Sequence, residues 1–177
     1  MSLIQKPINS KLHDYKEINN FMKRVFPEDE LIPMWLIVLL TKKKNHKFSA
    51  YYDNDLFVGV LYTIEKDNTV FVFYLAVNDK IHSKGYGSKL LTTLFEENEG
   101  KEITLFIETM DDKNASNYEQ RIKRLAFYER NGFVDTKFKA GLDSPYVDIL
   151  STDESFDIDK CKKLLKFIPM KIFTPNV

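Results

Sequence analysis

Residues 69–77 form a run that is apolar on both of the faces that a β-strand would present. A strand with one exposed face alternates apolar and polar residues, whereas a strand covered on both faces is apolar throughout. The run therefore predicts a central strand in a sheet that is covered on both sides. An amphipathic helix follows, with an apolar stripe at Leu90, Leu91 and Leu94, and residues 101–110 return as a strand. Two strands joined by one helix are expected to be parallel neighbours with a right-handed crossover.

The rest of the chain adds strands and helices on either side of this unit. Residues 47–53 and 56–65 are strand-like, and short polar turns separate them from each other and from residues 69–77, so the three runs predict an antiparallel meander. Closing strands are predicted at residues 133–139 and 146–151. Helical patterns or helix-end signals predict four more helices, at residues 12–25, 28–44, 116–131 and 158–168. The predicted fold class is mixed α+β, with an extra helix at the C-terminal end.

Charged and capping residues indicate where two of these helices begin and end. Acidic residues 28–30 and basic residues 42–44 would complement the dipole of the second helix. Ser116 and Glu119 match a capping box at the start of the fourth helix, and Gly132 is suited to the left-handed residue after its end.

Composition excludes several classes of protein. The 26 Lys and Arg residues equal the 26 Asp and Glu residues, which argues against a nucleic-acid binder, because such proteins carry a basic excess. The longest apolar run, residues 32–40, is shorter than the roughly 20 residues that span a bilayer, so we expect no membrane contact. We also read no secretion signal, and the single cysteine, Cys161, fits a reducing interior, which predicts a cytoplasmic protein. The three histidines do not form a metal set, and no linker divides the predicted single domain of residues 1–177.

The segment from residue 78 to residue 88 joins the predicted central strand to a helix and contains Gly85 and Gly87. Backbone amides at a helix start are free to bind an anion, and glycines allow a phosphate to approach the main chain. A dinucleotide fingerprint fails because its third glycine would fall at Leu90, and the chain has no P-loop motif. Taken alone, this segment fits a phosphate-binding loop and an ordinary helix start equally well.

A second motif lies beyond the next strand, where residues 128–133 read Tyr-Glu-Arg-Asn-Gly-Phe. In this order, residues 82–87 and 128–133 resemble the GNAT superfamily of acyl-CoA-dependent N-acetyltransferases, whose pyrophosphate loop is usually Arg/Gln-x-x-Gly-x-Gly/Ala and whose later motif is Tyr-x-x-x-Gly-Phe. The resemblance implies a mixed sheet of about seven strands. It covers most of residues 1–150, the family core, and leaves residues 151–177 as a C-terminal extension. His82 stands where the family usually has Arg or Gln, and Arg121 and Arg124 stand where it often has Asn and Ala.

The resemblance implies that acetyl-CoA is the co-substrate and that an acetyl group passes directly to an amine. The pantetheine arm would pair with the main chain of three strand residues, and the diphosphate would lie on the loop and helix start. The implied cofactor-binding residues are Leu75, Ala76, Val77, His82, Ser83, Lys84, Gly85, Tyr86, Gly87 and Ser88. For Tyr86 the residues themselves favour a packing or surface ring over a catalytic role.

Two catalytic residues are predicted, each with an alternative. Tyr128 would protonate the departing thiolate, and its alternative is packing in a helix stripe with Leu125. Glu108, near the end of its strand, would be the general base if burial raised its pKa, and its alternative is a strand-end charge paired with Lys or Arg. Glu65 is a second choice of base, and a chain of water molecules would need no base residue.

Three functions remain open at this stage. The first is an N-acetyltransferase acting on a primary amine, the second is an acyl-CoA sensor without turnover, and the third is an unrelated nucleotide-binding domain. Small-molecule amines, polyamines, aminoglycosides and peptide N-termini are all possible acceptors, and either a monomer or a homodimer is compatible with the sequence. Residues 28–30 and Trp35 would attract a cationic amine, although the acids serve equally well as helix-start charges.

Overall fold

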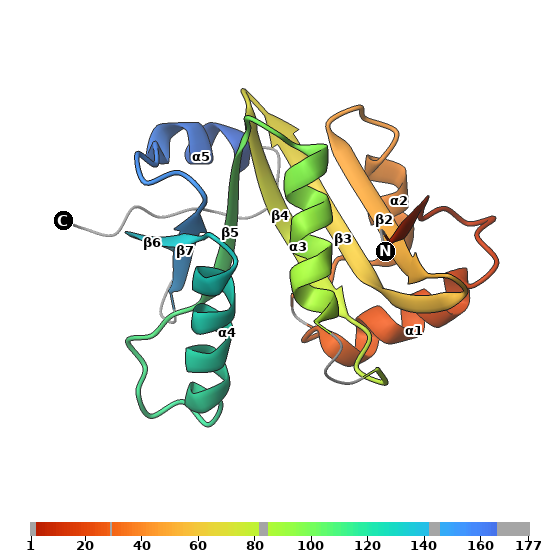
Figure 1. The fold of residues 1–177 in the computed structure, drawn as a ribbon, viewed down its shortest axis with the longest axis horizontal. Coiled ribbons are helices and arrows are strands. Elements are labelled where there is room, and N and C mark those ends of the chain that lie inside the picture. Colours follow the sequence, from red (N-terminus) through yellow and green to blue (C-terminus); the bar gives the residue numbers. More distant parts are fainter. Residues whose placement is uncertain (1–2, 29, 82–84, 142–145, 166–177) are drawn as a thin grey trace. The chain divides into compact units, whose positions relative to one another are not determined.

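The computed structural model describes residues 3–28, 30–81, 85–141 and 146–165 (Figure 1). The elements are β1 (Ile4–Pro7), α1 (Tyr15–Val25), α2 (Met34–Leu40), β2 (His46–Asp53), β3 (Leu56–Lys66), β4 (Thr69–Val77), α3 (Tyr86–Glu97), β5 (Glu102–Glu108), α4 (Tyr118–Arg130), β6 (Val134–Ala140), β7 (Val147–Ser151) and α5 (Ile158–Leu165). The chain forms two compact units. Unit 1 comprises residues 1–64 and 73–99, and unit 2 comprises residues 65–72 and 100–177.

The strands form one seven-stranded mixed sheet in the order β1-β2-β3-β4-β5-β7-β6. Strand β2 is antiparallel to β1 and β3, strand β4 is parallel to β5, and strand β7 is antiparallel to β5 and β6. The predicted mixed α+β class, with its parallel strand-helix-strand unit and extra C-terminal helix, is confirmed. The prediction of a single domain stays a prediction.

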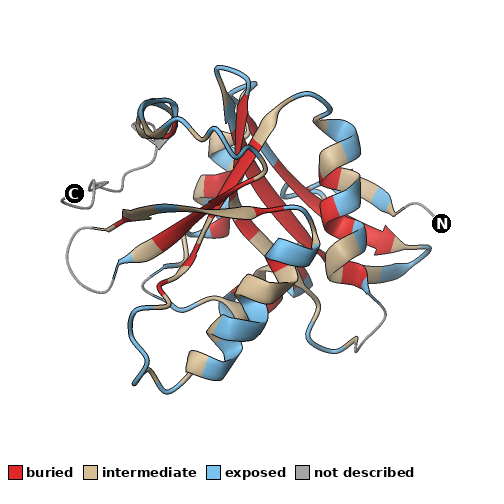
Figure 2. Ribbon diagram, turned by 60° about the vertical axis from the view of Figure 1, so that its left-hand side comes forward, coloured by how far each residue is buried: buried red, intermediate tan, exposed pale blue. Residues whose placement is uncertain are grey.

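Unit 1 has a core of aromatic and aliphatic side chains on both faces of its strands. Helix α3 covers one face with Leu90, Leu91 and Leu94, and helices α1 and α2 cover the other face (Figures 1 and 2). On the side of α1, the rings of Phe21 and Phe57 meet edge to face, with 5.2 Å between their centroids. Continuous apolar strands are stable here because helices cover both faces.

Unit 2 is built on β5, whose Ile103, Leu105 and Ile107 are buried. Helix α4 buries much less, because Tyr128 is its only buried residue, and its outer surface is exposed (Figure 2). The described part of α5 contributes Cys161, which is 2% exposed.

Three local predictions were wrong. Helix α2 begins at Met34, with Pro33 at its N-cap, so the acidic residues near position 30 do not lie in its first turn. The capping box at Ser116 does not form, because the N-cap is Asn117 and its side chain donates instead to Glu108. Strand β1 was not predicted, because it is short and depends on edge pairing with β2.

Other local predictions were confirmed or lie outside the described residues. Gly132 has a φ of 89°, as expected for the left-handed residue after α4. The predicted C-terminal helix is described only as far as Leu165. Within the described residues, no helix has the length and apolar character that would be needed to cross a bilayer.

Candidate active site

The N-terminus of α3 lies in unit 1 and presents free backbone amides. Its N-cap is Gly85, whose φ of 67° is left-handed, and a Cβ at this position would meet no atom within 4 Å. No side chain of the described residues caps this helix start, and its first turn has no acidic residue. The first amides of a helix have no intrahelical partner, and the dipole favours an anion there. The predicted residues His82, Ser83 and Lys84 lie outside the described part of the chain.

The chain on either side of this loop is anchored. Arg24 forms a bidentate ion pair with Asp79, with nitrogen–oxygen distances of 2.6 and 2.7 Å. The amide of Asn78 donates to the carbonyl oxygen of Val58 at 2.7 Å. After the loop, the hydroxyl of Tyr86 donates to Asp53 at 2.9 Å, and the Tyr86 ring is 5% exposed. Tyr86 therefore packs, as its residue type indicated.

The C-terminal end of β4 carries Leu75, Ala76 and Val77, which are half-buried. The parallel ladder with β5 joins residues 69–72 to residues 102–105, so these three residues come after its last pair. Strand β3 comes unusually close to this end. A Cβ on Gly59 would lie 2.2 Å from the carbonyl oxygen of Ala76 and 3.1 Å from the Cα of Val77.

Tyr128 lies near the end of α4 in unit 2 and is 9% exposed. Its ring contacts Phe127 and Phe133 edge to face, with centroid distances of 5.2 and 5.5 Å. Burial raises the pKa of Tyr128 to about 12, although the charge of Arg124 opposes this shift. Within the described part of the chain, the Tyr128 hydroxyl makes no hydrogen bond. The packing alternative accounts for the ring, and the role of the hydroxyl as an acid stays a prediction.

Glu108, also in unit 2, is held by two residues of α4 and by Asn117, the N-cap of this helix. Asn117 donates to its Oε1 at 2.6 Å, the Nε of Arg121 is 3.6 Å from the same oxygen, and Arg124 forms a short ion pair with Oε2. Burial by itself would raise the pKa of Glu108, but the hydrogen bond from Asn117 and the charges of Arg124 and Arg121 outweigh burial and lower it. The expected raised pKa is therefore wrong, and the predicted ion pair with Arg is present. The role of Glu108 as a base stays a prediction.

The second-choice base, Glu65, is exposed and pairs with Lys101 at 2.7 Å. An exposed ion pair of this kind contributes little to the stability of the fold.

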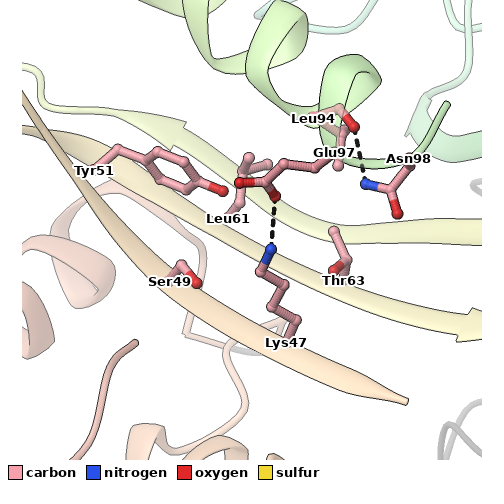
Figure 3. Close-up of a pocket in the computed structure, with 8 residues that line it drawn as sticks. All are labelled: Lys47, Ser49, Tyr51, Leu61, Thr63, Leu94, Glu97 and Asn98. Atoms are coloured by element: carbon pink, nitrogen blue, oxygen red, sulfur yellow. Dashed lines mark hydrogen bonds and ion pairs between the residues drawn. The ribbon is translucent and has the colours of Figure 1, made fainter. Parts of the chain in front are cut away.

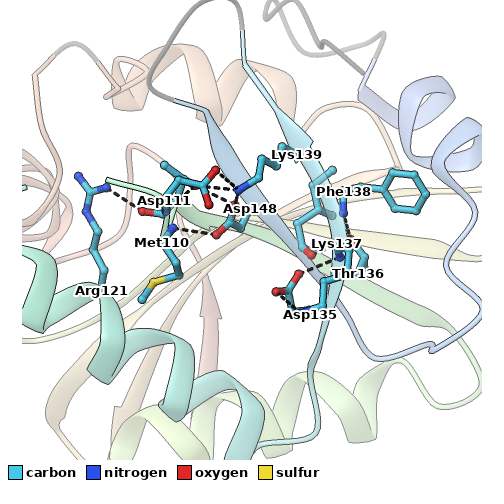
Figure 4. A network of polar contacts seen from close by, with 11 residues as sticks. Met110, Asp111, Arg121, Asp135, Thr136, Lys137, Phe138, Lys139 and Asp148 are labelled. Atoms are coloured by element: carbon cyan, nitrogen blue, oxygen red, sulfur yellow. Dashed lines mark hydrogen bonds and ion pairs between the residues drawn. The ribbon is translucent and has the colours of Figure 1, made fainter. Parts of the chain in front are cut away.

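A polar network that was not predicted from the sequence lies at the ends of β5, β6 and β7 (Figure 4). Asp148 is 6% exposed and accepts from Thr109 Oγ1 at 3.0 Å, Met110 N at 2.9 Å and Lys139 Nζ at 2.8 Å. Lys139 also pairs with Asp111 at 2.8 Å. One signal was available, because Asp148 is the single charged residue in the otherwise apolar run of residues 147–150, and such a charge needs a partner.

A pocket in unit 1 is separate from the predicted site residues. It lies between the strands and the end of α3 and has a volume of about 10 Å³, and Lys47 pairs with Glu97 across it at 2.6 Å (Figure 3). Its lining residues are Lys47, Ser49, Tyr51, Leu61, Thr63, Leu94, Glu97 and Asn98. Ligand pockets usually exceed about 300 Å³, so this one is too small for a nucleotide-sized ligand. Among the described residues, no group of three or more His, Cys, Asp or Glu side chains is placed to hold a metal ion.

Solved structures share this fold over nearly the whole chain. A protein assigned to the GNAT family of acetyltransferases, from Bacteroides thetaiotaomicron, aligns with a TM-score of 0.74 and 22% identity, over 93% of this chain and 97% of that one. A Bacillus subtilis acetyltransferase in complex with CoA has a TM-score of 0.60 and 14% identity, over 86% and 99%. The ribosomal-protein-S18-alanine N-acetyltransferase of Escherichia coli has a TM-score of 0.62 and 15% identity, over 88% and 96%.

Comparison with curated proteins finds no match in sequence. A family model, in contrast, agrees with the structural similarity. Residues 44–135 match the family model described as the acetyltransferase (GNAT) domain, and this segment covers just over half of the 177 residues. It contains β4, the start of α3 and the Tyr128 to Phe133 motif. The chain therefore belongs to the GNAT family of acetyltransferases.

Proposed function

We propose that this protein transfers the acetyl group of acetyl-CoA directly to the amine of an acceptor. The observation that carries this proposal is the position of Tyr128, whose ring is buried at the end of α4 in the family's Tyr-x-x-x-Gly-Phe motif and whose hydroxyl makes no hydrogen bond to another described residue. Among the described residues, no buried side-chain oxygen or nitrogen lacks a hydrogen-bond partner, so this hydroxyl is not an unpaired group sealed inside the protein. It can therefore meet a reaction partner.

The start of α3 fits the diphosphate of CoA. Among the described residues, no side chain caps the amides after Gly85, the first turn has no acidic side chain, and no atom lies within 4 Å of a Cβ placed on Gly85. Solved members of the same fold carry CoA, the Bacillus subtilis acetyltransferase among them. We propose that the amides of Tyr86, Gly87 and Ser88, together with the preceding residues of the loop, bind the diphosphate, and that the main chain of residues 75–77 binds the pantetheine arm.

Tyr128 would act as the general acid. A phenol is protonated at neutral pH, so it has a proton to give to the thiolate of CoA as the carbon–sulfur bond breaks. The acceptor nitrogen forms the new bond to the acetyl carbon and loses a proton. Holding both reactants in one site makes this attack effectively unimolecular, and no covalent enzyme intermediate is needed.

Removal of the acceptor proton has three predicted routes, Glu108, Glu65 or water. Both carboxylate oxygens of Glu108 already face donors from α4, which leaves a proton little access to them. This arrangement favours water as the route.

The proposal is tested by measuring release of free thiol from acetyl-CoA in the presence of pooled amines, with wild type, Tyr128→Phe and Tyr118→Phe. Tyr118 is the matched control, because it lies at the other end of α4 and is half-buried. We expect Tyr128→Phe to lower kcat about 10²-fold or more while the Kd for acetyl-CoA changes little, and Tyr118→Phe to behave like wild type. Tight binding of acetyl-CoA with no turnover in any pool would contradict the enzyme and support the sensor alternative.

A further inference from the structure

Four side chains of α4 and its N-cap lie on one face of the helix. Asn117, Arg121, Arg124 and Tyr128 are spaced by four, three and four residues, which places them in a single stripe. The first three contact Glu108 at the end of β5, and the fourth is the proposed acid. The stripe therefore connects the carboxylate of Glu108 to the turn that carries Tyr128.

Arg121 adds two further bonds to this connection. Its side chain is 10% exposed, its Nε donates to Asn117 Oδ1 at 2.9 Å, and its Nη1 donates to the carbonyl oxygen of Thr109 at 2.8 Å. The first two turns of α4 are thus joined to the end of β5 by both side-chain and main-chain acceptors.

The end of β5 is itself held from the other side. Glu108 pairs with Val147 in the ladder to β7, and the next two residues donate to the buried carboxylate of Asp148 (Figure 4). The main chain at Glu108 is therefore held in place by hydrogen bonds, so the Glu108 side chain can fix the position of α4.

Apolar packing holds α4 weakly by comparison. Of its thirteen residues, all of them described, only Tyr128 is buried. A helix is usually stabilised by the burial of an apolar face, so a helix that buries a single side chain depends more on its polar contacts.

We propose that Glu108 is a positioning residue, whose contacts with Asn117, Arg121 and Arg124 hold α4 on the end of β5 and thereby set the position of the Tyr128 hydroxyl. This inference rests on the proposed role of Tyr128 as general acid. It differs from the role of general base, in which Glu108 would receive the proton of the acceptor amine.

The first test is native-state hydrogen exchange, which needs neither substrate nor turnover. We expect Glu108→Ala to make the amides of α4 exchange about tenfold faster, because it removes hydrogen bonds to a charged group. We expect Glu108→Gln to change them less than about threefold, because the amide oxygen still accepts from Asn117. Glu65→Ala is the matched control, since it removes a carboxylate of the same unit that pairs only at the surface, and it should leave α4 unchanged. Unchanged α4 exchange in Glu108→Ala would overturn the proposal.

The second test separates positioning from proton transfer. A positioning role predicts that Glu108→Ala lowers kcat at least about tenfold with little change in the KM for acetyl-CoA, whereas Glu108→Gln recovers most of kcat and keeps the acidic limb of the pH–rate profile. A general base predicts that both variants lose about 10²-fold or more and that the limb disappears, and that result would overturn the proposal. If no amine is turned over, the acetyltransferase proposal fails, whereas the exchange experiment still decides whether Glu108 holds α4.

Discussion

Replacing Gly59 by alanine tests the geometry of the β4 end directly. The added Cβ would lie 2.2 Å from the carbonyl oxygen of Ala76, whereas real Cβ contacts stay beyond 3.0 Å, so the strand backbone must move by at least the difference of 0.8 Å. The obstacle is main chain in two paired strands, which cannot move aside as a flexible side chain would. Forcing extra atoms into a packed interior costs about 1–3 kcal/mol, which for a domain of this size corresponds to a Tm lower by roughly 4–8 °C at the middle of that range.

The displaced residues are the same ones that are proposed to bind the pantetheine arm. We therefore expect Gly59→Ala to weaken acetyl-CoA binding as well as to lower Tm, and both effects can be measured by calorimetry. Gly100→Ala is the control, because Gly100 has a φ of 75° with open space around it and lies in the turn between α3 and β5. Its substitution should lower stability by backbone strain and leave acetyl-CoA binding unchanged. A Gly59→Ala protein with the Tm and the Kd of wild type would refute the close approach of β3 and β4.

Three further predictions concern buried groups. Burial and the nearby Lys43 lower the pKa of His46, so the folded state disfavours the protonated imidazole. The free energy of unfolding should therefore decrease as the pH drops below about 6.5, where the unfolded chain takes up the proton. Denaturant unfolding at pH 7.5 and 5.5 should show a smaller decrease for His46→Gln than for wild type. Asp148→Ala should reduce the free energy of unfolding by about 3 kcal/mol, because it leaves the part-buried Lys139 without its main partner. Asp135→Ala breaks a surface pair and should cost less than about 1 kcal/mol. Urea titration measures both values. Burial, then the charge of Glu102, raises the pKa of Cys161 to about 12, so a thiol reagent should modify it quickly only in denaturant; rapid reaction in the native protein would show that α5 is not docked as described.

The residues of the candidate site differ in how far sequence could locate them. The glycine loop and Tyr128 could be predicted as site residues because their motifs are short, local and placed next to strongly patterned elements. The surroundings of Glu108 could not be predicted, because its partners lie 9 to 16 residues further along the chain. The capping box predicted at Ser116 is not formed. Glu108 illustrates why a residue type and its place on a strand cannot decide a pKa, since the shift depends on which cations the fold brings to it.

The sequence by itself determined the order and type of the main elements, the central position of β4 and the family. These follow from the alternation of apolar residues and from turn and glycine signals, which act between neighbours in the chain. Only the tertiary structure decided that β1 forms an edge strand and that Gly59 lies against Ala76. It also decided two ion pairs, between Asp148 and Lys139 and between Glu108 and Arg124. Each of these depends on contacts between residues distant in sequence, and their energy comes from the packing and electrostatics of the assembled fold.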